Sequence, residues 1–191
     1  MSRKLGAIHP DHFVPIAEQD GAIDRLTHWV LQHGLHQLSE WRREGMEFTV
    51  SMNISARNLH DLSLPDTLSE LCAEHDVPTD SIILELTETA AMENAATTLD
   101  VLTRFRIKGF HLSIDDFGTG YSSLVQLQRL PVSELKIDRA FVMNLSHSTT
   151  SRVIAQTVSA MGKSLGLSVI AEGVEDELAV GILREMGCDT A

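Results

Sequence analysis

Five short segments of this chain alternate apolar and polar residues, and each ends near a side chain that can ionise or bind metal. They span about residues 47–53, 81–87, 110–115, 134–137 and 167–172, and their polar end residues are Asn53, Glu85, Asp115, Lys136 and Glu172. Alternate residues of a strand face opposite sides, so each polar group lies opposite its strand's apolar face. Parallel strands in a barrel show this pattern, because the apolar face meets the outer helices and functional groups gather at the carboxyl-terminal rim.

The segments between these strands have the spacing of helices. Apolar residues recur near helical spacing at about 22–41 and 152–165, and two further helices are expected at about 95–108 and 177–186. Pro65 suits a helix start and Gly187 a helix end, and a short helix is expected from Leu124 until Pro131. Two prolines and Gly21 predict a loop for the first twenty residues.

Strands that alternate with helices over short connections predict a parallel sheet with helical crossovers. An open doubly wound sheet is the rival fold, and it is less favoured because no glycine-rich phosphate loop opens the chain. We expect one domain over residues 1–191, since the chain has no linker or low-complexity stretch.

The chain is strongly acidic. Its 27 Asp and Glu residues against 15 Lys and Arg give a formal charge of −12, which argues against binding to duplex nucleic acid. A small phosphorylated ligand is still compatible, because a bound metal can supply positive charge locally. Cys72 and Cys188 fit a reducing compartment, and with no secretory signal or membrane-spanning run we expect a cytoplasmic protein. Four histidines in short-spaced pairs are interpreted as surface or helix residues: His9, His12, His33 and His36.

The run from Asp115 to Leu124 is the most informative single segment. Asp115 and Asp116 end an apolar strand, and a turn with two glycines and several hydroxyl groups follows at once. Carboxylates at a strand end can hold a divalent metal, and a loop that begins there can close over a substrate, which suits metal-assisted hydrolysis. Structural roles stay open for single residues: Asp116 as a cap of the turn, Lys136 as an ion-pair partner, and Asn53 as a partner of backbone groups.

The motifs together resemble the EAL domain, a phosphodiesterase domain that opens cyclic di-GMP. The resemblance rests on six segments that occur in family order and span nearly the whole chain. They are Phe13-Val14-Pro15-Ile16-Ala17-Glu18, Met52-Asn53-Ile54-Ser55, Leu84-Glu85-Leu86-Thr87-Glu88, the run from Asp115 to Leu124, Lys136-Ile137-Asp138, and Ala171-Glu172-Gly173-Val174-Glu175.

This resemblance implies an α/β fold, the TIM-type (β/α)8 barrel of the EAL domain, with a two-metal site for Mg²⁺ or Mn²⁺. By analogy, Asn53, Glu85 and Asp115 hold the first metal, and Asp115 with Asp116 holds the second. Lys136 and Glu172 would orient or activate the attacking water, and which of them is the base stays open. The resemblance also implies that Glu88 and one loop support metal and substrate binding. The residues of this loop are Phe117, Gly118, Thr119, Gly120, Tyr121, Ser122 and Ser123, and Glu175 would support the loop.

The chain departs from the family at both ends. The Glu-Ala-Leu signature and an Arg would precede Gly6, and a Gln-Gly strand would follow Asp189, so we expect the N-terminal strands and the last strand of the barrel to be missing. Exposed strand edges and helix faces would then favour a homodimer or a higher assembly.

The resemblance implies hydrolysis of cyclic di-GMP to linear pGpG in bacterial second-messenger signalling, with sensor or cyclase domains in the parent protein. The alternative is a catalytically inactive module that binds cyclic di-GMP or a partner protein, because the signature Glu and the terminal Gln are absent from the sequence. A third hypothesis, an unrelated metal-dependent barrel enzyme, is disfavoured by the run from Asp115 to Leu124 and the segment from Glu172 to Glu175.

Overall fold

A single sheet of five parallel strands organises the protein. The computed structural model describes residues 8–93, 95–120 and 124–191, and the strands lie in the sheet in the order in which they occur in the chain. Each neighbouring pair is parallel, so every carboxyl end points to the same rim. The strands are β1 (Val50–Asn53), β2 (Ile82–Thr87), β3 (His111–Phe117), β4 (Glu134–Ile137) and β5 (Ser168–Ala171).

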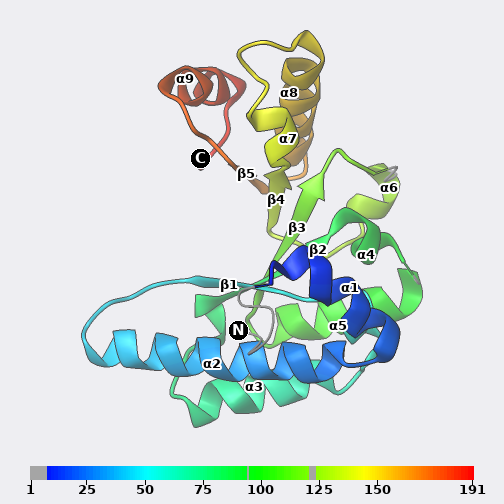
Figure 1. Cartoon of the computed structure of the whole chain (residues 1–191), viewed down its shortest axis with the longest axis vertical. Coiled ribbons are helices and arrows are strands. Elements are labelled where there is room, and N and C mark those ends of the chain that lie inside the picture. The colour runs from blue at the N-terminus through cyan, green and yellow to red at the C-terminus, as the bar shows by residue number, and fades with distance from the viewer. Residues whose placement is uncertain (1–7, 94, 121–123) are drawn as a thin grey trace.

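Helices connect the strands and cover the outer face of the sheet (Figure 1). Figure 1 shows one group of helices around β1 to β3 and a second group, α7 to α9, around β4 and β5. The helices are α1 (Pro10–Asp20), α2 (Ile23–Arg43), α3 (Leu64–Glu74), α4 (Glu88–Met92), α5 (Ala95–Ile107), α6 (Leu124–Leu127), α7 (Arg139–Val142), α8 (Thr149–Ser164) and α9 (Glu177–Met186), with short 3₁₀ turns at Asn58–His60 and Thr79–Ser81.

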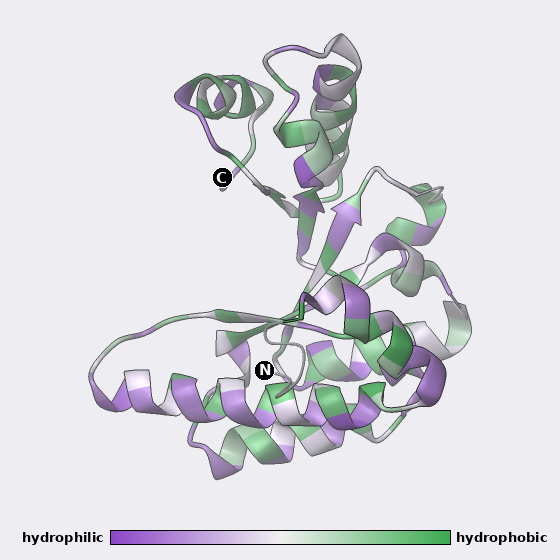
Figure 2. Cartoon of the chain, in the orientation of Figure 1, coloured by the Kyte–Doolittle hydropathy of each residue, from purple (hydrophilic) through white to green (hydrophobic). Residues whose placement is uncertain are grey.

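The core forms where the apolar strand faces meet the helices. Leu84 and Leu86 of β2, Leu112 of β3, and Leu135 and Ile137 of β4 are all at most 1% exposed. The helices are two-sided, with hydrophobic stripes turned toward this core and hydrophilic stripes turned outward (Figure 2). The predicted separation of apolar and polar strand faces is therefore confirmed.

The amino-terminal segment is helical, although its prolines and glycine predicted a loop. Residues 10–20 form α1. Pro10 occupies the first turn of this helix, where its missing N–H needs no partner. Gly21 then ends the helix with φ 74°, and its N–H bonds to the Glu18 carbonyl oxygen. Pro10 and Gly21, which predicted a loop, are thus the start and stop signals of a short helix, and Pro15 lies inside it.

Two further helices, α4 and α7, were not predicted because each is only a turn or so long. Both begin directly after a strand, and both are capped by the first polar side chain at that strand end. Thr87 accepts a hydrogen bond from the Ala90 N–H, and Asp138 accepts one from the Ala140 N–H. These caps turn the chain sharply at the carboxyl-terminal rim. The rim loops are therefore short and place their polar side chains close to the strand ends.

Candidate functional site

Lys136 lies at the centre of the carboxyl-terminal rim and binds carboxylates from three other strands. Its Nζ is 2.8 Å from Glu85 Oε1 of β2 and 3.4 Å from Asp115 Oδ1 of β3, and it also contacts Glu172 Oε1 after β5. Lys136 and Glu85 are each 7% exposed, whereas the Glu172 side chain is 33% exposed. The structure therefore brings together four of the predicted site residues, with Glu172 on the solvent side.

The charge of Lys136 is maintained by these partners. Burial alone would lower the pKa of the ammonium group, but hydrogen bonds with Glu172 and Glu85 and the charges of Glu85 and Asp115 raise it above its usual value. Lys136 is therefore a protonated hydrogen-bond donor at neutral pH.

A bulge in β3 brings the second carboxylate of the Asp115-Asp116 pair to the same rim. Consecutive residues of a regular strand point to opposite faces. Here the pairing of β3 with β4 shifts between Ile114 and Phe117, and Asp116 adopts a left-handed conformation with φ 55°. The Asp116 N–H donates to Asp115 Oδ1 at 3.0 Å, which orients the first carboxylate.

Asp116 is consequently crowded by other acids. Its pKa is raised to about 6 by burial, by a hydrogen bond with Asp138, and by the charges of Asp115, Asp138 and Glu172. Asp138 was not included among the predicted site residues, although it shares the face of Lys136 in the sequence pattern. That shared face is the signal that could have identified it.

Glu88 lies beneath the loop that follows β3. Its side chain is 3% exposed, and its Oε2 accepts hydrogen bonds from the N–H groups of Gly118 at 3.0 Å and Gly120 at 3.1 Å. A Cβ at Gly120 would lie 2.7 Å from Glu88 Oε1, so a side chain at this position would displace the carboxylate. Thr119 Oγ1 donates to the Asp116 carbonyl oxygen at 2.8 Å. These bonds tie the loop to the bulge that carries the acidic pair.

The remaining predicted residues are less closely joined to this cluster. Asn53 pairs with Glu85 in the sheet register and ends β1 at the same rim, but its side chain is exposed. Phe117 is buried at 7% exposure and belongs to the core. Glu175 is exposed and makes no hydrogen bond or ion pair within residues 8–93, 95–120 and 124–191. Tyr121, Ser122 and Ser123 lie outside the described residues.

The donor chemistry of the rim fits a hard divalent cation. Glu85, Asp115 and Glu172 place three carboxylates against the ammonium of Lys136, and two more, Asp116 and Asp138, interact with this group of acids. Carboxylate and amide oxygens are the ligands that Mg²⁺ and Mn²⁺ prefer. Among the described residues, no group of three or more acidic, histidine or cysteine side chains is arranged to hold a metal ion. The Lys136 ammonium lies where the Glu85 and Asp115 oxygens converge.

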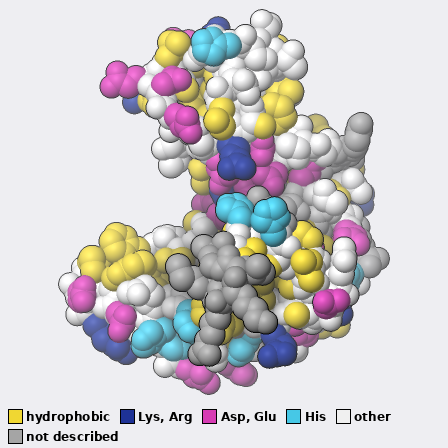
Figure 3. Space-filling view, in the orientation of Figure 1, with side chains coloured by type: hydrophobic (Ala, Val, Ile, Leu, Met, Phe, Trp, Pro, Cys, Tyr) yellow, Lys and Arg dark blue, Asp and Glu magenta, His cyan; other side chains and the backbone are white. Residues whose placement is uncertain are grey.

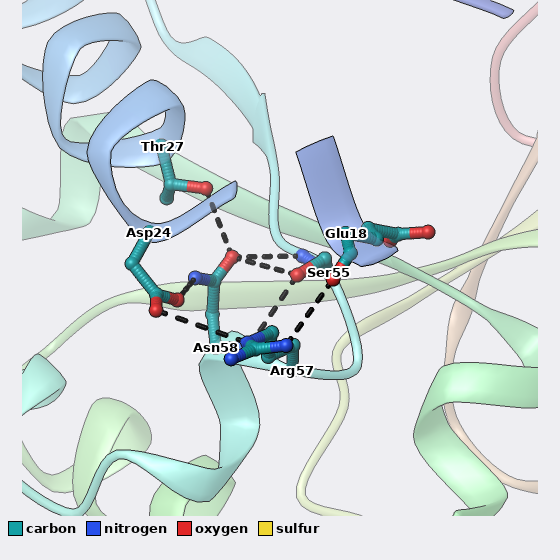
Figure 4. A network of polar contacts seen from close by, with 6 residues as sticks. All are labelled: Glu18, Asp24, Thr27, Ser55, Arg57 and Asn58. Atoms are coloured by element: carbon teal, nitrogen blue, oxygen red, sulfur yellow. Dashed lines mark hydrogen bonds and ion pairs between the residues drawn. The ribbon is translucent and has the colours of Figure 1, made fainter. Parts of the chain in front are cut away.

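A second buried polar network fixes the end of β1 (Figure 4). Asn58, 3% exposed, accepts hydrogen bonds from the Thr27 hydroxyl at 2.9 Å and from the Ser55 N–H and hydroxyl, and it donates to Asp24 Oδ1 at 2.8 Å. Arg57 donates to the Glu18 carbonyl oxygen and lies 3.9 Å from Asp24. These bonds join α1 and α2 to the segment after Asn53, so they hold the carboxyl end of β1 in place.

Three cavities in the described part of the chain lie away from Lys136. One, of about 810 Å³, lies beside Arg57 and His60. Another, of about 540 Å³, lies between the ends of α2 and α3 and has the buried Cys72 in its wall. A third, of about 450 Å³, lies beside Phe48 and Asp80. No helix formed by the described residues is both long and apolar enough to cross a lipid bilayer.

Comparison with known proteins shows which family the sequence matches. The sequence model of the EAL domain matches residues 1–191. The chain is 39% identical over 186 residues to the bifunctional diguanylate cyclase/cyclic di-GMP phosphodiesterase MucR of Pseudomonas aeruginosa. The matched region covers 97% of this chain and 27% of MucR. It is 42% identical over 185 residues to the cyclic di-GMP phosphodiesterase NbdA of the same species, covering 96% of this chain and 24% of NbdA. The chain thus spans about a quarter of the length of these relatives.

Solved structures agree with this likeness. The cyclic di-GMP complex of the MucR phosphodiesterase superposes with a TM-score of 0.92 at 38% identity, over 98% of this chain and 76% of that chain. A manganese and cyclic di-GMP complex of Klebsiella pneumoniae BlrP1 gives a TM-score of 0.82 at 26% identity, over 96% of this chain and 46% of that chain. Together with the five parallel strands, these likenesses confirm the predicted fold class, an incomplete TIM-type barrel.

Proposed function

Because the chain belongs to the EAL domain family, we propose that it hydrolyses cyclic di-GMP to linear pGpG with two divalent cations, Mg²⁺ or Mn²⁺. One observation carries this proposal: carboxylates from separate strands converge with Lys136 at the carboxyl-terminal rim of a parallel barrel. The relatives named as cyclic di-GMP phosphodiesterases support the choice of substrate. We place residues 1–191 in one domain of this kind and assign it to the cytoplasm in bacterial signalling.

The rim residues divide into two proposed groups of ligands. Asn53, Glu85 and Asp115 would hold the first cation, and Asp115 with Asp116 would hold the second. Bound divalent cations would lower the pKa of water and stabilise the attacking and leaving oxygens of a phosphodiester. The β3 bulge supports the shared role of Asp115, because it directs two consecutive carboxylates to one rim.

Lys136 and Glu172 would then handle the attacking water. The raised pKa of Lys136 keeps its ammonium protonated, so it can orient a water by donating a hydrogen bond but cannot accept a proton. Glu172 contacts Lys136 and is the more exposed of the two, so we assign proton acceptance to Glu172. Glu88 would hold the loop from Phe117 to Ser123 against the metals and the substrate, with Glu175 as a further support of that loop.

The alternative is a module that binds cyclic di-GMP or a partner protein without turnover. The observation that favours it is the ion pairing of Lys136 with Glu85 and Asp115, because the ammonium already neutralises two of the proposed ligands. Metal binding would have to compete with that ammonium.

We further propose that the protein assembles as a homodimer or larger oligomer. β1 and β5 are the outer strands of the sheet among the described residues, and Thr190 already pairs with Ile170 of β5. The outer edge of β1 therefore favours pairing with other chains. The lengths of the relatives support additional sensor or cyclase domains in the parent protein, since the chain spans about a quarter of them.

The test is chromatography of cyclic di-GMP after incubation with the protein and Mn²⁺. We expect pGpG from the wild type and a loss of at least about a hundred-fold in turnover for Asp115→Asn, because a shared ligand is weakened. Asp80→Asn is the matched control, since Asp80 is exposed before the amino end of β2, far from the rim. Binding of cyclic di-GMP without any pGpG would favour the binding module instead.

A further inference from the structure

Arg139 is a basic side chain at the functional rim that the proposed chemistry leaves unused. Two basic residues occur in the segments that directly follow the strand ends, Arg57 after β1 and Arg139 after β4. Arg57 is held by the Glu18 carbonyl oxygen and Asp24. The Arg139 side chain is exposed, and its guanidinium has no hydrogen bond or ion pair within the described ranges. It is therefore available to a ligand.

The base of Arg139 is fixed beside the cluster. It follows Asp138, whose carboxylate accepts a hydrogen bond from the Ala140 N–H and acts on the nearby Asp116. On its other side it packs against Gly173, the residue after Glu172. A Cβ added to Gly173 would lie 2.8 Å from Arg139 Cβ, and Gly173 has φ 70°, so glycine permits this close approach. The side chain thus starts between the two loops that carry Asp138 and Glu172.

The negative charge of the rim would be partly offset by a guanidinium group such as that of Arg139. Three carboxylates contact the Lys136 ammonium there, and Asp116 and Asp138 add two further acids to the group. Figure 3 shows acidic side chains gathered with basic ones in the hollow at the level of β4 and β5. An anionic phosphodiester would be repelled by these acids wherever cations do not neutralise them. A guanidinium at the border of the cluster offers two parallel N–H donors to the non-bridging oxygens of a phosphate.

We propose that Arg139 binds a phosphate group of the cyclic dinucleotide and so determines substrate affinity. This inference rests on the proposed function. Arg139 contacts the phosphate in the bound substrate and takes no part in moving the proton, which stays with the groups around Lys136. Its removal therefore weakens binding and leaves the chemical step nearly unchanged.

The experiment compares Arg139→Ala, Arg139→Lys and the control Arg43→Ala in steady-state hydrolysis with Mn²⁺ and in calorimetric binding of cyclic di-GMP. Arg43 is also an exposed arginine. It lies at the end of α2, before the amino end of β1, and thus away from the carboxyl-terminal rim. Arg139→Ala should raise KM and Kd about ten- to a hundred-fold with kcat within about two-fold. Arg139→Lys should recover part of the affinity, because a point charge remains but the paired donors are lost.

Salt dependence provides a readout that a structural role would not change. The slope of log KM against log salt concentration should become shallower in Arg139→Ala and stay unchanged in Arg43→Ala. Unchanged KM and Kd in Arg139→Ala, or an equal loss in Arg43→Ala, would overturn the inference and leave the proposed function standing. A wild type that neither binds nor hydrolyses cyclic di-GMP would overturn both. Equal melting temperatures for the variants would exclude misfolding as the cause.

Discussion

The two buried polar networks, around Lys136 and around Asn58, are built on opposite principles. The Asn58 network consists mainly of amide and hydroxyl hydrogen bonds that are each satisfied within the protein (Figure 4). The Lys136 network sets one ammonium against an excess of carboxylates, and one of these, Asp116, has its pKa raised to about 6. A network in which every polar group is hydrogen-bonded stabilises the fold, whereas a cluster with an excess of negative charge is typical of a site that binds a cation.

The difference has a structural cause. Asn58 joins α2 to the segment after β1, because its partners are Asp24 and Thr27 of that helix and the nearby Ser55. The acids around Lys136 come from β2, β3 and the segments after β4 and β5, because parallel strands end at one rim. The fold therefore concentrates like charges there, and their repulsion helps to raise the pKa of Asp116.

Replacing Lys136 with Met should give the largest effect. The variant leaves the buried Glu85 carboxylate without its cation, which we expect to cost about 3–5 kcal/mol in the free energy of unfolding at neutral pH without metal. Urea unfolding measures this loss. Adding Mn²⁺ should recover more stability in the variant than in the wild type, because a cation can replace the ammonium. Equal stabilisation of both proteins by Mn²⁺ would contradict the idea that Lys136 and the metal share ligands.

Replacing Asn58 with Leu should cost less, about 1–3 kcal/mol, because the Thr27 hydroxyl and the Ser55 N–H lose a buried acceptor. Asn144→Leu is the matched control, since Asn144 is exposed. Adding Thr27→Val to Asn58→Leu should recover part of the loss, because both partners of that bond are then apolar. Turnover per folded molecule should stay within about two-fold of the wild type, in contrast to Asp115→Asn.

The smallest effect concerns pH. The pKa of Asp116 is raised from its usual 3.8 to about 6, so between these values the folded chain binds more protons than the unfolded chain. Without metal, the contribution of Asp116 to stability should therefore fall as the pH rises from about 4 to 6. Affinity for Mn²⁺ should increase over the same range, because the cation displaces that proton. Calorimetric titrations at several pH values test this, and Asp116→Asn should flatten both trends.

Sequence patterns predicted most of the fold because local and tertiary forces agree in it. The residues of β4 and α9 were predicted with the bounds that the structure shows, since alternation marks the strand and a helical stripe with Gly187 at its end marks the helix. α1 was missed because Pro10 and Gly21 serve equally well in a loop and at the boundaries of a short helix, and because Pro15 lies inside the helix, where proline is rare. The choice between them depends on packing against α2, which sequence spacing does not describe.

The sequence by itself determined which residues reach the rim, because strand alternation and parallel direction leave one place for Glu85, Asp115 and Lys136. The tertiary structure alone decided how they meet. The left-handed turn at Asp116 converts two residues of opposite faces into neighbours. It also leaves room for Glu88 beneath Gly118 and Gly120. Bulges and contacts between distant loops arise from the curvature of the assembled sheet, and no local pattern of residue types encodes that curvature.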